Sequence, residues 1–167
     1  MAGERILVRR GGAGDAGPIA RFVSLALGGR EAVDVKQVVD RLGDVGFFLA
    51  EQEGNLVGVI GWRVENLVAR VTDLLVWPSH LRDVVGPALL GEMEAAAKGL
   101  QAEAAVLFVP RSGGAELLEF GEALGYEPRT IGHMPQAWRE TAYEAGREDD
   151  EEILVKELRS DRVVRPL

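Results

Sequence analysis

The residue in this 167-residue chain best placed to move a proton is Asp73. It lies in Leu67–Trp77, a segment that is apolar at most positions and therefore has the composition of a central strand. A carboxylate at this place could attract a cation and accept its proton. The competing interpretation is an ion pair with Arg70 or Arg63 that only holds the sheet together.

Few other residues offer chemistry. His80 and His133 fall in segments typical of loops, where an exposed histidine without a catalytic role is the simpler interpretation. The chain has no cysteine, so disulfides and thiolate metal sites are excluded. No His, Asp or Glu cluster has the spacing of metal ligands, and no G-K-[S/T] sequence of a phosphate-binding loop occurs.

A second site is predicted directly after the strand that carries Asp73. Pro78 ends the strand because it has no N–H to give to a sheet. Gly86-Pro87 then opens a segment whose apolar residues recur at helical spacing, and a proline in the first helical turn loses no hydrogen bond. A strand followed by a short loop and a helix directs free N–H groups to one point, which suits a phosphate group.

A glycine pattern near the N-terminus invites another interpretation. Gly12, Gly14 and Gly17 form G-x-G-x-x-G, and Asp34 has the spacing of the acidic residue in a dinucleotide-binding unit. Asp34, however, adjoins a segment of helical rather than strand periodicity. The alternative is that Asp15 caps a helix whose first turn contains Pro18 and whose buried face includes Ile19, Phe22, Val23 and Ala26.

Composition limits the classes of partner. With 47% hydrophobic and 28% charged residues, the chain is predicted to be one globular domain over 1–167. The net charge of −8 argues against nucleic acid and favours small cationic molecules. Neither a membrane span nor a signal peptide is apparent, so we expect a cytoplasmic protein.

Periodicity predicts an alternation of strands and helices in the order β-α-α-β-β-β-α-β-α-β-β. Gly58 and Gly61 within a strand indicate a bulge, a close approach by another group, or plain packing. The segment 133–150 is an insertion before the last strand, where Trp138 and Tyr143 could pack on the sheet, cover a cleft or form a dimer contact. The predicted elements are the strands 4–10, 46–52, 56–64, 67–77, 104–110, 126–131 and 152–158, with helices near 15–27, 33–42, 86–100 and 116–124.

This order, and the strand–loop–helix segment after Asp73, resemble the GCN5-related N-acetyltransferases (GNAT). The resemblance implies an α/β (α+β) fold, with a central mixed, mostly antiparallel sheet of about seven strands flanked by four or five helices. It further implies acetyl-CoA as the cofactor, a small-molecule amine as the acceptor and the possibility of a homodimer. Groups near Asp73 line the acceptor side of the cleft in the family, which makes Asp73 the catalytic candidate.

The resemblance also marks residues for the cofactor. The family's Val-x-Pro strand ending is kept as Val76-Trp77-Pro78, and its pyrophosphate loop has the pattern [Q/R]-x-x-G-x-[G/A]. When this pattern is aligned on Gly86, Leu81 stands at the Arg/Gln position and Val84 at the first glycine; shifting it by one residue starts it at Arg82 instead. The valine crowds the loop and Pro87 removes a donor, so we expect weak or absent CoA binding. The implied cofactor-binding residues are Leu75, Val76, Trp77, Arg82, Val84, Val85, Gly86 and Ala88.

A further feature of the family is missing. The tyrosine that often acts as general acid corresponds to Gly121, and the asparagine that often precedes it corresponds to Gly114. Three hypotheses therefore stay open. The chain is a working acyl-CoA-dependent N-acetyltransferase, a catalytically degenerate fold that binds a small molecule or partner, or a structural or dimerisation module.

Overall fold

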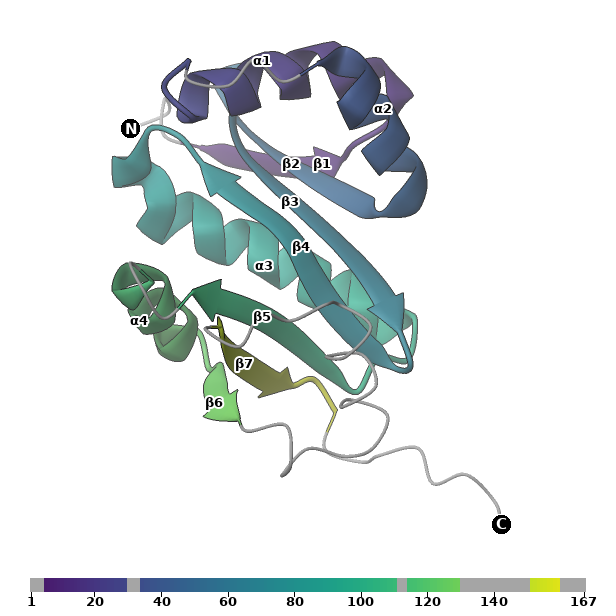
Figure 1. Ribbon diagram of the computed structural model, residues 1–167, viewed down its shortest axis with the longest axis vertical. Coiled ribbons are helices and arrows are strands. Elements are labelled where there is room, and N and C mark those ends of the chain that lie inside the picture. The colour runs from purple at the N-terminus through teal and green to yellow at the C-terminus, as the bar shows by residue number, and fades with distance from the viewer. Residues whose placement is uncertain (1–4, 30–33, 111–113, 130–150, 160–167) are drawn as a thin grey trace. The chain divides into compact units, whose positions relative to one another are not determined.

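The computed structural model describes residues 5–29, 34–110, 114–129 and 151–159. Seven strands and four α-helices occur in this part of the chain, in the predicted order (Figure 1). The strands are β1 (Ile6–Arg10), β2 (Gly46–Gln52), β3 (Asn55–Glu65), β4 (Val68–Val76), β5 (Ala104–Pro110), β6 (Glu127–Arg129) and β7 (Glu151–Glu157). The helices are α1 (Ala16–Ala26), α2 (Val35–Asp44), α3 (Arg82–Gly99) and α4 (Ala115–Ala123), with 3-10 turns η2 (Ala13–Asp15) and η3 (Ser79–Leu81).

The seven strands form one sheet in the order β1-β2-β3-β4-β5-β7-β6. The pairs β1–β2, β2–β3, β5–β7 and β6–β7 are antiparallel, whereas β4 and β5 are parallel, from Val68 opposite Ala104 to Arg70 opposite Val106. A parallel pair needs a crossover connection, and α3 supplies it. The mixed, mostly antiparallel sheet is therefore confirmed. A separation of these two strands near Trp77 stays a prediction.

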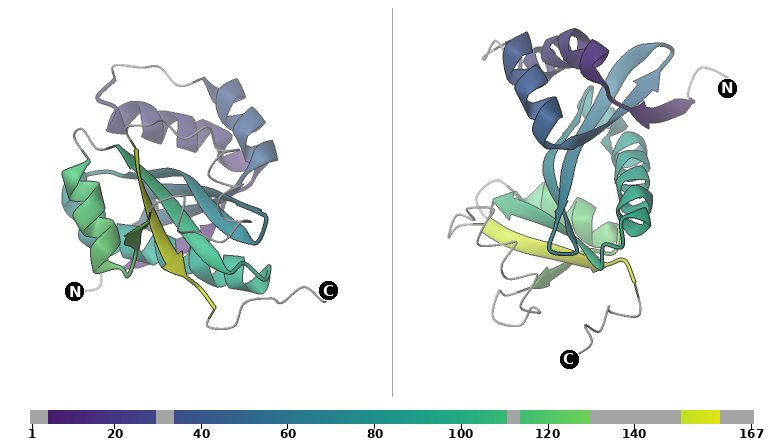
Figure 2. Two further views of the ribbon diagram at one scale, coloured as in Figure 1. Left: turned by 60° about the horizontal axis from the view of Figure 1, so that its bottom comes forward. Right: turned by 90° about the vertical axis from the view of Figure 1, so that its right-hand side faces the viewer.

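The chain divides into two compact units. The first comprises Met1–Arg63 and Thr72–Met93, and the second comprises Val64–Val71 and Glu94–Leu167. In the first unit, α1 and α2 cover one face of β2 and β3, and the start of α3 lies on the opposite face (Figure 2). The alternation of side chains along a strand explains this division. The core beneath α1 and α2 consists of Ala16, Ile19, Ala20, Phe22, Val38, Phe47, Leu49 and Val59.

The second unit has a core of its own, in which Val68 meets side chains of β5 and β7. A half-buried polar group joins its layers: Glu94 of α3 accepts hydrogen bonds from the Tyr126 hydroxyl (3.2 Å) and the Lys156 ammonium (2.9 Å). Burial, together with the Glu94 charge, raises the pKa of Tyr126 above its usual range. Tyr126 therefore holds its proton as part of this unit's packing.

Gly58 has both of the functions predicted for a strand glycine. Ala50 pairs with Gly58 but the next residue, Glu51, pairs with Leu56, so β3 contains a bulge at this point. A Cβ at Gly58 would also lie 2.6 Å from Cγ1 of Val85. The glycine therefore lets α3 lie directly on β3.

One local prediction was wrong, the place where the third helix begins. The helix α3 begins at Arg82 rather than at Gly86, because η3 leads into it without a loop between them. Pro87 consequently lies in the second turn, where its missing N–H leaves the carbonyl of Asp83 without its helical partner.

The dinucleotide-binding interpretation, which the helical periodicity next to Asp34 disfavours, does not hold. The first glycines lead into η2 and α1, and β1 pairs antiparallel with β2. Asp34 precedes α2, where its carboxylate accepts the N–H of Lys36 (3.3 Å) and Gln37 Oε1 accepts the N–H of Asp34 (3.1 Å). The Asp34 carboxylate thus caps the N-terminus of α2, and the Gln37 side chain bonds back to the Asp34 N–H, so Asp34 serves to start a helix. His133 and the insertion 133–150 lie outside the described residues.

Candidate active site

The carboxylate of Asp73 lies on β4 within the first unit, beside β3. Thr72 Oγ1 donates a hydrogen bond of 2.8 Å to Asp73 Oδ2. Successive residues of a regular strand point to opposite faces, so this contact between neighbours means that β4 departs from simple alternation here. The contact also turns one oxygen of the carboxylate toward its own strand.

Gly61 of β3 makes room for this carboxylate. A Cβ at Gly61 would lie 2.6 Å from Asp73 Oδ2 and 2.9 Å from Thr72 Oγ1, closer than atoms can approach. The Phe47 ring lies on another side of the same point, 3.2 Å from the hypothetical Cβ. The close approach predicted for Gly61 is therefore made by the carboxylate that sequence analysis selected.

Asp73 opens on a cavity of about 380 Å³ that lies entirely within the first unit. The walls come from five elements: α1, α2, β2, β3 and β4. Among the lining residues Asp73 is the one charged group and Gln37 the other polar one. The lining residues are Ile19, Val23, Gln37, Val38, Phe47, Val59, Asp73, Leu74 and Leu75.

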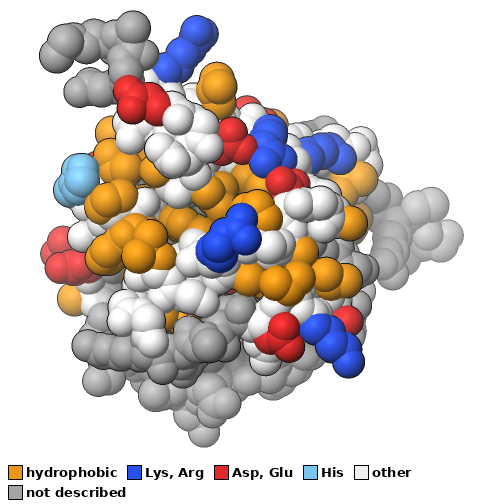
Figure 3. All heavy atoms as spheres, turned by 90° about the horizontal axis from the view of Figure 1, so that it is seen from above, with side chains coloured by type: hydrophobic (Ala, Val, Ile, Leu, Met, Phe, Trp, Pro, Cys, Tyr) orange, Lys and Arg blue, Asp and Glu red, His pale blue; other side chains and the backbone are white. Residues whose placement is uncertain are grey.

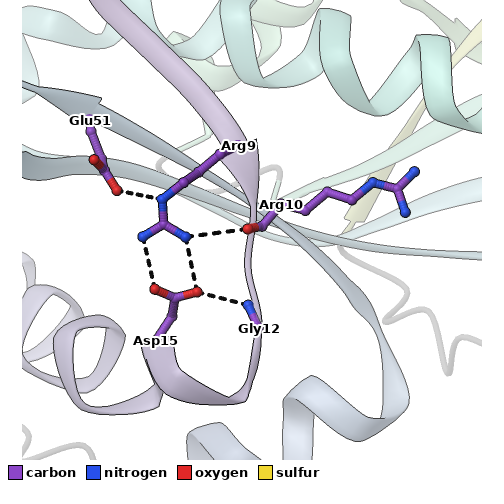
Figure 4. Close-up of polar contacts among 5 residues, drawn as sticks. All are labelled: Arg9, Arg10, Gly12, Asp15 and Glu51. Atoms are coloured by element: carbon purple, nitrogen blue, oxygen red, sulfur yellow. Dashed lines mark hydrogen bonds and ion pairs between the residues drawn. The ribbon is translucent and has the colours of Figure 1, made fainter.

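A polar network fixes where α1 starts, and with it one wall of the cavity. The guanidinium of Arg9 donates two hydrogen bonds to Asp15 (2.8 and 3.0 Å) and one to Glu51 (2.6 Å), and the N–H of Gly12 also donates to Asp15 (2.8 Å) (Figure 4). The guanidinium, followed by the Gly12 N–H, lowers the pKa of Asp15. Asp15 occupies the N-cap position of α1 as predicted, but its carboxylate binds these groups and not the helix.

The face of the first unit that α1 and α2 form carries exposed apolar residues. Hydrophobic side chains gather over α1 and α2 (Figure 3). Those that are large and exposed include Leu25, Leu27, Val35 and Val39. The helices α1 and α2 therefore have apolar residues on their outer surface as well as on the side that lines the cavity.

At the end of β4, where the cofactor was predicted to bind, one hydrogen bond shows which backbone groups face β3. The N–H of Trp77 donates to the carbonyl of Val57 on β3 (3.0 Å), and its side chain is 37% exposed. Backbone groups of successive strand residues point to opposite edges, so those of Val76 point away from β3. Leu75 contributes its side chain to the cavity wall. Of these three predicted residues, Val76 is therefore the one whose backbone can meet an extended ligand.

The other predicted cofactor residues all lie in the first two turns of α3. Val84 is 58% exposed and Ala88 is half-buried, whereas Val85 and Gly86 are buried against the sheet. Val84 has a helical backbone, so the positive φ for which a glycine would be needed does not arise at this position. The effect of Val84 on a bound phosphate is therefore limited to the bulk of its side chain, and weak or absent CoA binding stays a prediction.

The donors at the start of α3 are partly used. The N–H of Leu81 donates to the Pro78 carbonyl (3.0 Å), and the N–H of Arg82 donates to Ser79. Asp83 places a carboxylate in the first turn, where a phosphate would be repelled, beside the favourable charge of Arg82. This helix start can bind an anion, but less well than one with free donors and no acid.

Gly121, which stands where the family often has its general-acid tyrosine, lies in the second unit. Gly121 is buried on α4, and a Cβ there would lie 2.7 Å from Cδ1 of Leu154. A side chain at this place requires at least the end of the Leu154 side chain to move. His80 lies in η3 and is exposed, and among the described residues no three His, Asp or Glu side chains could hold a metal ion.

Sequence reasoning found Asp73 but not the walls of its cavity. The helical period placed Ile19 and Val23 on a buried face, without indicating that the face encloses a space. Gln37, Phe47 and Val59 gave no separate signal, because their alignment depends on how α2 and the sheet pack together.

Several solved structures of other proteins have the same fold as this chain. No described helix has the length and apolar character needed to cross a bilayer. A search of curated proteins finds no match. The ribosomal-protein-S18-alanine N-acetyltransferase of Escherichia coli has a similar structure (TM-score 0.70, 16% identity, 98% of this chain and 100% of the other). The PaiA N-acetyltransferase of Thermoplasma acidophilum, in complex with coenzyme A, is also similar, with a TM-score of 0.69, 14% identity and coverage of 92% of this chain and 99% of that one.

An acetyltransferase of the GNAT family from Staphylococcus aureus is equally similar, with a TM-score of 0.70, 16% identity and coverage of 93% of this chain and 100% of that one. At such identities these likenesses establish the fold alone. The family model "Acetyltransferase (GNAT) family" matches residues 26–126, more than half of the chain. The protein therefore belongs to the GNAT acetyltransferase family.

Proposed function

We propose that this protein transfers an acetyl group from acetyl-CoA to the nitrogen of a small amine. The observation that carries the proposal is the carboxylate of Asp73 at the wall of a largely apolar cavity, in a member of an acetyltransferase family. The matched residues 26–126 include parts of both compact units, which supports a single catalytic domain.

Asp73 would act on the amine. Its negative charge attracts the ammonium form, and its oxygens accept the proton that must leave before the nitrogen can attack. The apolar walls exclude water and strengthen this attraction. Acetyl-CoA, when bound, supplies a thioester: the nitrogen–carbon bond forms, the carbon–sulfur bond breaks, and the sulfur takes up a proton. No tyrosine occupies the family's acid position. The proton that the sulfur takes up would therefore come from the solvent, or it would be the proton that Asp73 removed from the amine.

The residues that would hold acetyl-CoA are the backbone of Val76 and the first turns of α3. Arg82 adds a positive charge there, while Asp83 and the two occupied N–H groups of η3 and α3 oppose the pyrophosphate. The complex of the Thermoplasma acidophilum enzyme with coenzyme A supports the cofactor for this fold. We expect binding that is weaker than in a relative with a glycine-rich loop.

The helix start also favours a second candidate function. If acetyl-CoA cannot bind there, the same cavity would make the protein a non-catalytic binding module for a small amine. Isothermal titration of the full chain with acetyl-CoA and free CoA separates the candidates. Binding with release of CoA on addition of amines supports the enzyme, and no binding at millimolar ligand refutes it.

A further inference from the structure

The lining of the cavity beside Asp73 limits which amines the cavity can accept. Binding of the amine does not depend on the proposed function, whereas its acetylation does. Seven of the nine lining residues are Ile, Val, Phe or Leu. We propose that the ligand of this cavity is a primary amine on a compact alkyl or aryl group, with one positive charge and no negative charge.

The charges of the wall support a single ammonium. Asp73 is the one ionised side chain among the lining residues, and no lysine or arginine is among them. A carboxylate or phosphate on the ligand would be buried without a counter-ion, which is a large penalty. A second ammonium at the far end of the ligand would likewise meet apolar side chains, so amino acids and diamines fit poorly.

The polar capacity of the wall is also small. Besides Asp73, the one polar lining residue is Gln37, and its Oε1 already accepts the N–H of Asp34 at 3.1 Å. A ligand with many hydroxyl groups would leave most of them without partners in the cavity. This argues against amino sugars and for a hydrocarbon body.

The volume sets the size of the ligand. At roughly 30 Å³ for each water molecule in the liquid, 380 Å³ corresponds to about a dozen water-sized groups. Gln37 is exposed, so the cavity reaches the surface at the start of α2. An amine of up to about a dozen non-hydrogen atoms would place its body among Val23, Val38 and Phe47 and its nitrogen at Asp73.

Isothermal titration of the full chain with three matched amines tests the inference. 2-Phenylethylamine has the proposed chemistry, L-phenylalanine adds one carboxylate to it, and 1,4-diaminobutane has two ammonium groups. We expect 2-phenylethylamine to bind at least about tenfold more tightly than either of the others. Equal or tighter binding of L-phenylalanine or the diamine overturns the inference, as does a lack of binding by 2-phenylethylamine.

Two variants locate the binding. Val23→Phe fills part of the cavity and should weaken 2-phenylethylamine about tenfold while leaving propylamine within twofold; Leu25→Phe, on the same helix but 59% exposed, should change neither. Asp73→Asn should weaken 2-phenylethylamine but not 2-phenylethanol, which has no charge. Equal effects on both members of either ligand pair contradict the assigned position.

The release of CoA from acetyl-CoA, measured in parallel, separates the two proposals. If the amines bind in the expected order and no CoA is released, the acetyltransferase proposal fails while the ligand class holds. If CoA is released fastest with L-phenylalanine or the diamine, the acetyltransferase proposal holds and the ligand class is wrong.

Discussion

The two regions joined by the end of β4 differ in how well they suit acetyl transfer. On one side, Asp73 lies at the wall of a cavity, and Gly61 leaves space for its carboxylate. On the other, the start of α3 carries Asp83 in its first turn and Pro87 in its second, and η3 uses N–H groups that an anion would need. Under the proposed function, the acceptor side would therefore have the cavity and the carboxylate that the reaction needs, whereas the start of α3 would offer fewer free donors to a pyrophosphate.

The difference shows that the two sides depend on different properties of a sequence. A cavity needs side chains of suitable size from several elements, and many combinations of Val, Ile, Leu and Phe provide it. A phosphate site needs free backbone donors in one place, so a single proline, acid or extra turn weakens it. The cofactor side is therefore the region where activity would be lost first.

Asp73→Asn should have the largest effect if the acceptor side is catalytic. The variant keeps the shape of the side chain and an acceptor for the Thr72 hydroxyl, but it can neither attract an ammonium nor take its proton. We expect the rate of CoA release with an amine to fall by about 10²–10⁴. Thermal unfolding of the variant is the control, and a large loss of stability with unchanged turnover would assign Asp73 to the sheet alone.

Gly61→Ala should damage the same side through geometry. Its Cβ would overlap Asp73 Oδ2, which must move, and we expect a loss of about 1–3 kcal/mol in the free energy of unfolding. Turnover should fall as well, because the displaced carboxylate no longer faces the cavity. Gly12→Ala is the matched control, since no atom lies within 4 Å of the Cβ it would add. Similar urea midpoints for the two variants would contradict the close approach.

Several features of this molecule could be predicted from sequence because they depend on local pattern. Hydrophobic period and turn residues indicate the order of the described strands and α-helices, though not the two 3-10 turns, and the apolar strand around Asp73 identifies the carboxylate. The sequence misplaces the start of α3, because a proline is typical of the first helical turn, whereas here η3 already leads into the helix at Arg82. The cavity could not be predicted, since its walls meet only when α1, α2 and the sheet pack together.

Restoring the cofactor side should have a smaller effect in the opposite direction. Leu81→Arg with Val84→Gly replaces two residues that depart from the family's loop, and it removes an exposed valine from the face of the helix start. We expect the Kd for CoA in isothermal titration to fall by about tenfold, which corresponds to about 1.4 kcal/mol.

A separate variant, Asp83→Asn, tests the acid in the first turn. It removes one charge next to the predicted phosphate position without changing shape, so CoA affinity should rise several-fold and lose part of its dependence on salt. Leu100→Asn, at an exposed position just beyond the end of α3, is a control that should leave CoA affinity unchanged. Unchanged affinity in both redesigned proteins would place the defect elsewhere than in this helix start.

The smallest effect is expected at Asp15, whose ion pair with the half-exposed Arg9 holds a wall of the acceptor side. Its pKa is lowered in the folded chain, so its ionised form stabilises the fold above the pKa of an unfolded aspartate, about 3.9, and this contribution is lost as the pH falls through the lower folded value. In Asp15→Asn an oxygen can still accept the Gly12 N–H, but the ion pair with Arg9 is gone. Because Arg9 is half exposed, we expect a loss of about 0.2–1 kcal/mol at pH 7. The difference in unfolding free energy between the two proteins should shrink as the pH is lowered below about 4, and a difference that grows with acid would contradict this assignment.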